Sequence, residues 1–125
     1  MTMDDETREG TELDVTLESL GDLALIVLSG EVDVYSAPRL RNVIRDLVDK
    51  GKYRMVVDLE KVAFMDSTGL GVLVGGLKRV KRHQGELGII CNQERILRIF
   101  RITGLTKVFP IYRSREDLLA SIEGA

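Results

Sequence analysis

One segment with helical periodicity lies between two short apolar runs, and this arrangement limits the possible folds more than any other feature of the sequence. The two runs, residues 24–28 and 54–59, have the length and the composition of buried strands. Between them, apolar side chains recur every three or four residues. Ser36 is placed to cap this helix, Pro38 falls in its first turn, and Gly51 fits the position just after its end. Because a helix that crosses between two strands of one sheet makes them parallel, the sequence predicts a parallel β-α-β unit.

The alternation of strand and helix patterns continues to the end of the chain. A helical face that begins at Leu70 precedes a buried strand at residues 87–91, and a second amphipathic face follows at residues 96–103. A short edge strand broken by a proline is expected at residues 108–111, and Ser114 is placed to cap a last helix. These patterns predict repeated β-α units.

The first part of the chain predicts an antiparallel pair of strands. Residues 13–17 alternate apolar and polar side chains, and Gly21 and Asp22 suit a two-residue turn into the first apolar run. A hairpin followed by alternating helices and strands argues for an α/β fold, a single domain with a small mixed β-sheet and about four helices.

Residues 1–12, with five acids and one arginine, are expected to be an acidic flexible tail, and residues 13–122 are expected to form the domain.

Composition and charge argue against several classes of protein. The chain is 44% hydrophobic and 30% charged, as in ordinary globular proteins. Its longest apolar run, residues 70–77, is far shorter than the ~18 residues of a membrane-spanning helix, and its acidic start is unlike a signal peptide, so we expect a cytoplasmic protein without a membrane segment. The single cysteine, Cys91, is expected to be buried and unreactive. A net charge of −2, with basic residues spread over several segments, argues against direct nucleic-acid binding.

The stretch FMDSTGLG, residues 64–71, places hydroxyl side chains in the loop between a predicted strand and a predicted helix. In an open α/β sheet, functional sites gather in the loops that follow the carboxyl ends of the strands. Ser67 or Thr68 could simply cap the helix, which is what most serines in such places do. The glycines that follow spell neither G-x-G-x-x-G nor G-x-x-x-x-G-K-[ST], so they indicate close helix packing rather than a phosphate loop. Three of them, Gly69, Gly71 and Gly75, could also let a binding partner approach the helix closely.

Enzymatic and metal-binding functions find little support among the residues. A nucleophilic Ser67 would need a base, and the only histidine, His83, would lie ~20 Å away at the far end of the predicted helix. One cysteine and one histidine exclude the usual zinc patterns, and Asp33, Asp58 and Asp66 are more simply strand-end and turn acids. We therefore expect no enzyme activity, no metal and no cofactor.

Four segments together resemble a known family. They are GEVD at residues 30–33, RMVVDL at 54–59, FMDSTGLGVLVG at 64–75 and RITGL at 101–105. From about residue 13 to residue 122, the chain closely resembles the STAS-domain anti-sigma factor antagonists of bacteria, and D-S-T-G-L-G after a strand is the most specific part. The resemblance implies a small mixed sheet with helices, in agreement with the patterns above.

The resemblance also implies a phosphorylation switch. In that family, the serine that matches Ser67 is phosphorylated by an anti-sigma factor that is also an ATP-dependent serine kinase. The unphosphorylated antagonist binds this kinase and frees the sigma factor, and a metal-dependent serine phosphatase resets the switch. Asp66 would then shape the loop that the kinase recognises, and Asp33 matches the acid of the family's G-E-[LIV]-D turn near this loop. With the matching helix start included, the expected partner-binding residues are Asp33, Asp66, Ser67, Thr68, Gly69 and Leu70.

Two other functions stay open. Many STAS domains keep the fold without the serine switch and serve in transporter-associated or multi-protein sensory assemblies. A receiver-like aspartyl phosphocarrier would instead use Asp58. It needs paired acids for Mg²⁺, which Glu31 and Asp33 supply only ambiguously, and a late lysine, for which Lys107 is a poor match.

Overall fold

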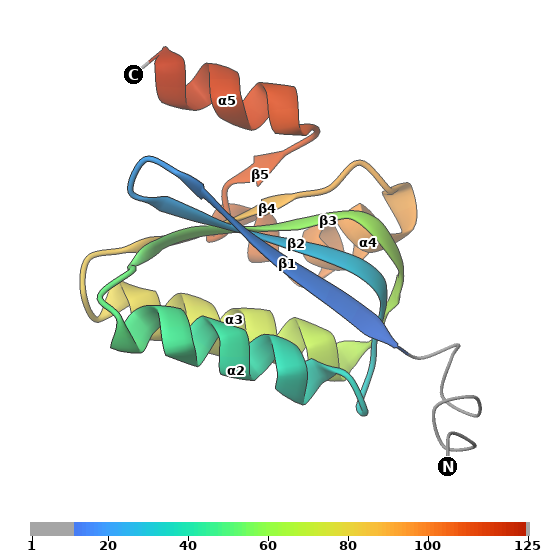
Figure 1. Ribbon diagram of the computed structural model, residues 1–125. Coiled ribbons are helices and arrows are strands. Elements are labelled where there is room, and N and C mark those ends of the chain that lie inside the picture. Colours follow the sequence, from blue (N-terminus) through green and yellow to red (C-terminus); the bar gives the residue numbers. More distant parts are fainter. Residues whose placement is uncertain (1–11, 125) are drawn as a thin grey trace.

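A mixed five-stranded sheet forms the centre of the molecule (Figure 1). The computed structural model describes residues 12–124. In their order across the sheet, the strands are β1 (Leu13–Leu20), β2 (Leu23–Val32), β3 (Arg54–Met65), β4 (Glu86–Ile90) and β5 (Ile111–Tyr112). The helices are α2 (Ala37–Asp49), α3 (Ser67–Lys81), α4 (Glu94–Ile102), α5 (Arg115–Glu123) and the short 3-10 helix η2 (Leu105–Lys107). The predicted α/β fold, with a small mixed sheet and about four helices, is confirmed.

The β-hairpin and the first β-α-β unit form as predicted. β1 turns into β2 at Gly21 and Asp22, and these two strands are antiparallel. All other neighbouring strands run parallel, and the first parallel pair, β2 and β3, is connected through α2. Just beyond α2, Gly51 has a φ of 79°, a backbone conformation that residues with a side chain rarely adopt.

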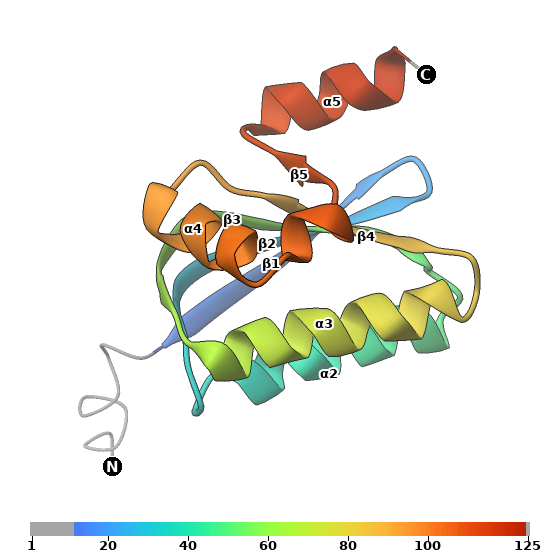
Figure 2. The same ribbon diagram turned by 180° about the vertical axis from the view of Figure 1, so that it is seen from behind.

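The helices cover the two faces of the sheet unequally. Figure 2 shows α2 and α3 side by side on one face, with α5 on the opposite face. Because side chains alternate along a strand, Met55, Val57 and Leu59 of β3 enter the main core with α2, α3 and α4. Val56 points the other way, into a small second core that Leu118 of α5 helps to close. The main core therefore fixes the position of α3 on the sheet.

β3 extends six residues beyond its predicted end at Leu59 and stops at Met65. This extension pairs only with β2, because β4 ends at Ile90. On the other edge, the Gln93 side chain takes the place of a strand and donates hydrogen bonds of 2.6–3.3 Å to the carbonyls of residues 59, 60 and 62. Charged residues of the extension, such as Lys61, are exposed. Sequence reasoning took these polar residues for a loop. In the structure, Asp66 alone connects β3 to α3.

The edge strand at residues 108–111 is displaced from its predicted position. β5 begins only at Ile111, after Pro110, whose nitrogen has no hydrogen to donate. The carbonyl of Pro110 instead accepts a hydrogen bond of 2.8 Å from the Ile89 amide of β4. Phe109, which the prediction placed in this strand, is a core residue, and its ring packs edge-on against Phe100 with centroids 5.6 Å apart.

Other predictions concern single residues or the ends of the chain. Cys91 is fully buried, as expected, and burial raises the pKa of its thiol. Ser114 caps α5 by accepting a hydrogen bond from the Asp117 amide. Within residues 12–124, no helix has both the length and the apolar character that crossing a membrane requires. The predicted tail lies outside the described residues, except for Glu12.

Candidate functional site

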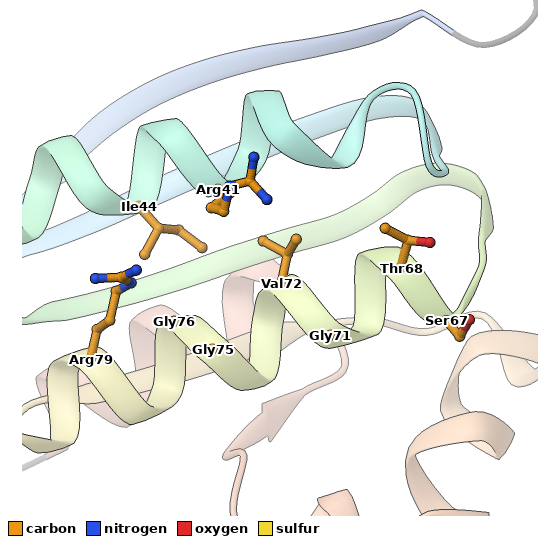
Figure 3. A pocket seen from close by; sticks show the side chains of 9 residues that line it. All are labelled: Arg41, Ile44, Ser67, Thr68, Gly71, Val72, Gly75, Gly76 and Arg79. Atoms are coloured by element: carbon orange, nitrogen blue, oxygen red, sulfur yellow. The ribbon is translucent and has the colours of Figure 1, made fainter.

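Ser67 is the first residue of α3 and is exposed. β3 ends two residues before Ser67, at the edge of the sheet where the carboxyl end of β2 also lies. The Asp66 amide donates a 3.1 Å hydrogen bond to the carbonyl of Val32, the last residue of β2. Ser67 and Thr68 also line one end of a groove between α2 and α3 (Figure 3). The fold thus presents the hydroxyl at a position fixed by two neighbouring strands.

The N-terminal cap of α3 is Asp66, and the predicted capping role of Ser67 or Thr68 is wrong. The Asp66 carboxylate accepts hydrogen bonds from the amides of Thr68, at 2.9 Å, and Gly69, at 3.2 Å. Its extended backbone, with a ψ of −174°, is the geometry of an N-cap residue. Because β3 runs to Met65, the first non-strand position is occupied by Asp66 rather than by the hydroxyls. Within residues 12–124, the Ser67 hydroxyl forms no hydrogen bond, so the fold does not use it.

Replacing Asp66 with alanine is expected to lower the free energy of unfolding by about 0.5–2 kcal/mol, because two amides of the first turn of α3 lose their acceptor. Replacing Ser67 with alanine should leave it almost unchanged. Urea denaturation of the two variants beside the wild-type protein measures both values. If the Ser67 variant lost as much stability as the Asp66 variant, the hydroxyl would have a structural role that contradicts this assignment of the cap.

A tightly bonded loop, residues 33–36, follows β2 and holds Asp33 at the end of the sheet where Ser67 begins α3. The Asp33 carboxylate accepts hydrogen bonds from the amides of Tyr35 and Ser36, both at 3.0 Å. Ser36 occupies the N-cap position of α2, as predicted, but its hydroxyl does not cap the helix. It accepts a bond from the Asp33 amide at 2.9 Å and donates to the Glu31 carbonyl at 2.8 Å, so it closes the loop instead. Asp33 and Asp66 thus follow the ends of two paired strands, as the sequence led us to expect.

Sequence reasoning missed three exposed apolar side chains in this part of the molecule. Val34 and Tyr35, in the Asp33 loop, are 56% and 81% exposed, and Phe64, opposite Glu31 in the sheet, is 43% exposed. An apolar pair inside a predicted loop was the signal that could have revealed the first two. Large apolar side chains gathered at one end of a sheet are typical of a surface that binds another protein.

The predicted partner-binding residues of α3 differ in their accessibility. Thr68 is exposed and Leu70 is half-buried, but Gly69 is buried. A Cβ atom at Gly69 would lie 2.6 Å from a methyl group of Val32 and 2.9 Å from the Met65 side chain. The missing side chain at Gly69 is therefore needed for packing inside the domain.

The structure separates the groups that the alternative chemistries require. Asp58 is buried in β3, opposite Val27, whereas Glu31 lies four residues beyond Val27 on β2, about 13 Å further along the sheet at ~3.3 Å per residue. A receiver-like acid cluster around Asp58 therefore does not include Glu31.

Beside Asp58, burial and the neighbouring carboxylates of Asp58 and Glu116 raise the pKa of Glu60. Within the described part of the chain, no three histidine, cysteine or acidic residues are arranged to hold a metal ion.

His83 lies beyond the end of α3 opposite to Ser67. Its ring stacks on Tyr53 with centroids 4.0 Å apart. A helix of 15 residues, at ~1.5 Å per residue, separates the two positions by more than 20 Å. His83 therefore cannot act as a base for Ser67 within one molecule.

Comparisons with known proteins agree on one group of relatives. The sequence model of the STAS domain matches residues 14–118. The anti-sigma-B factor antagonist of Bacillus subtilis (strain 168) is 44% identical over 89 residues, which cover 71% of this chain and 81% of that protein. The anti-sigma-B factor antagonist of Staphylococcus aureus (strain NCTC 8325 / PS 47) is 40% identical over 91 residues, covering 73% and 84%. The crystal structure of an anti-sigma factor antagonist from Mycobacterium paratuberculosis superposes with a TM-score of 0.81 at 28% identity, covering 90% of this chain and 95% of that one.

Proposed function

Since the chain belongs to the STAS-domain family of bacterial anti-sigma factor antagonists, we propose that it binds an anti-sigma factor and that phosphorylation of Ser67 ends this binding. The unphosphorylated form holds the anti-sigma factor and so frees the sigma factor. The anti-sigma factor is itself the serine kinase, and a serine phosphatase restores the binding form. In this account the chain is a substrate of its partner and not an enzyme, and the cytoplasmic location remains a prediction.

The observation that carries the proposal is the unused hydroxyl of Ser67. The hydroxyl is exposed and free of hydrogen bonds within residues 12–124, because Asp66 caps the helix in its place. A kinase can therefore reach it without unfolding any part of the domain. Asp33 and the exposed apolar side chains of Val34, Tyr35 and Phe64 supply a protein-binding surface at the same end of the sheet.

A phosphate group at Ser67 is compatible with the fold. It adds about −1.5 to −2 charges at neutral pH, and the positive end of a helix dipole stabilises such a charge by ~0.3–1 kcal/mol. In an interface, the same charge must lose its water beside the carboxylate of Asp66. Phosphorylation is therefore expected to change the binding surface while leaving the structure intact.

Phosphate mapping on the native protein tests the proposal without a prior choice of kinase. We expect peptide mass spectrometry to find phosphate on Ser67 when the protein is isolated from its own cells with phosphatases blocked. Deletion of the gene of the anti-sigma factor kinase should remove this phosphate. A Ser67 that stays unmodified through growth and stress would contradict the switch and would instead favour a constitutive STAS scaffold.

A further inference from the structure

A groove of about 390 Å³ runs between α2 and α3 on the surface of the domain (Figure 3). Its floor is apolar, with Ile44 from α2 and Val72 from α3. Ser67 and Thr68 line one end of it. The groove is therefore continuous with the proposed phosphorylation site.

Two glycines on the wall of this groove have no role in the packing of the domain. A Cβ atom at Gly71 or at Gly75 would meet no heavy atom within 4 Å. Gly76 differs, because a Cβ atom there would lie 3.0 Å from Leu87 and 3.1 Å from Ile44. Glycine inside a helix destabilises it relative to alanine. Packing inside the domain therefore explains Gly69 and Gly76 but neither Gly71 nor Gly75, for which the sequence also left the close approach of a partner open.

Two arginines border the same groove. Arg41 extends from α2 near the middle of the groove, between Ile44 and Val72, and Arg79 extends from α3 at the end away from Ser67 (Figure 3). Among residues 12–124, neither guanidinium forms an ion pair with a carboxylate. Guanidinium groups are strong, directional donors to carboxylates. The groove thus combines an apolar floor, two glycines on one wall and two cations without carboxylate partners among the described residues.

We propose that this groove binds an acidic helix of the anti-sigma factor, an inference that rests on the function proposed above. The absent side chains of Gly71 and Gly75, one turn apart, let the backbone of a partner helix approach α3 closely. Carboxylates of that helix pair with Arg41 and Arg79, and its apolar side chains contact Val72 and Ile44. A phosphate group on Ser67 would then lie at one end of the groove, close to carboxylates of the bound helix. Repulsion between these negative charges would favour release of the anti-sigma factor.

Charge reversal tests the acidic character of the occupant. The probe is the anti-sigma factor of the source bacterium that co-purifies with the wild-type chain, and titration calorimetry measures its Kd. We expect R41E and R79E each to weaken binding at least tenfold. K78E is the matched control, because Lys78 is the exposed neighbour of Arg79 on α3 but does not line the groove, and it should change the Kd less than twofold. If R79E and K78E had equal effects, the acidic-helix proposal would be wrong.

Alanine at the two glycines tests the close approach. The double variant G71A/G75A is expected to raise the Tm by several degrees, because alanine favours the helix and nothing obstructs the new methyl groups. The same variant is expected to bind the anti-sigma factor at least tenfold more weakly. A loss of binding in a more stable protein cannot come from misfolding. Unchanged binding together with a raised Tm would overturn the proposal.

The outcomes separate the groove from the switch. If S67D lost binding while the groove variants bound like the wild type, the phosphorylation proposal would stand and the groove proposal would fail. If the groove variants lost binding and S67D bound normally, the groove would be the interface and Ser67 would not control it. A wild-type chain that bound no anti-sigma factor of its own bacterium would contradict both.

Discussion

Replacing Ser67 with aspartate is expected to weaken binding of the anti-sigma factor at least a hundredfold, whereas replacing it with alanine should leave the Kd within a few-fold of wild type. A hundredfold change corresponds to about 3 kcal/mol, which is within the range for a charge that loses its water without a partner. The new carboxylate would stand directly beside that of Asp66, at the exposed start of α3. Alanine removes only a hydroxyl that the fold does not use.

A matched variant separates the position of the charge from its sign. S121D places the same charge on an exposed part of α5, on the face of the sheet opposite to α3, and should not change the Kd. All three variants should keep a Tm close to that of the wild type, because none of the replaced side chains is buried. Equal binding by the alanine and aspartate variants at Ser67 would show that charge does not control the interface.

The fold could be predicted from the sequence where hydrophobic periodicity decides it. The first crossover helix, the hairpin at Gly21 and Asp22, and the buried strand after Gly85 each have one face or both faces in the core, so their patterns are unambiguous. The second half of β3 was missed because it carries exposed and charged residues, and because its only strand partner is β2. Its polar residues look like a loop, and only the length of β2 reveals that a pairing partner is present.

The position of the candidate site was predictable, but the roles within it were not. The motif around Ser67 and the acid at Asp33 were found from the sequence, and the structure brings both to the same end of the sheet. The identity of the cap depends on where β3 ends, and a shift of one residue transfers that role from a hydroxyl to Asp66. The glycines of α3 look alike in the sequence. Which of them faces the core, and which faces the groove, depends on how α3 lies against α2 and the sheet.

Valine at Gly69 is expected to lower the free energy of unfolding by about 2–3 kcal/mol, which is typical of overpacking in a filled core. Already the Cβ atom would lie 2.6 Å from Val32, a buried β-branched side chain with little freedom to rotate, and 2.9 Å from Met65. To relieve these contacts, the start of α3 has to move away from β2 and β3. Urea denaturation measures the loss of stability.

Because this movement would displace Ser67 and Asp66 from the Asp33 loop, G69V is also expected to weaken binding of the anti-sigma factor, even in protein that remains folded. Valine at Gly71, two residues along the same helix, is the control for stability, since its Cβ atom meets nothing within 4 Å and should change the free energy of unfolding by less than about 1 kcal/mol. Equal stability of G69V and G71V would mean that α3 can shift on the sheet without loss. Ser67 would then not be held in a fixed position, and a switch that depends on the exact placement of one charge would lose its structural basis.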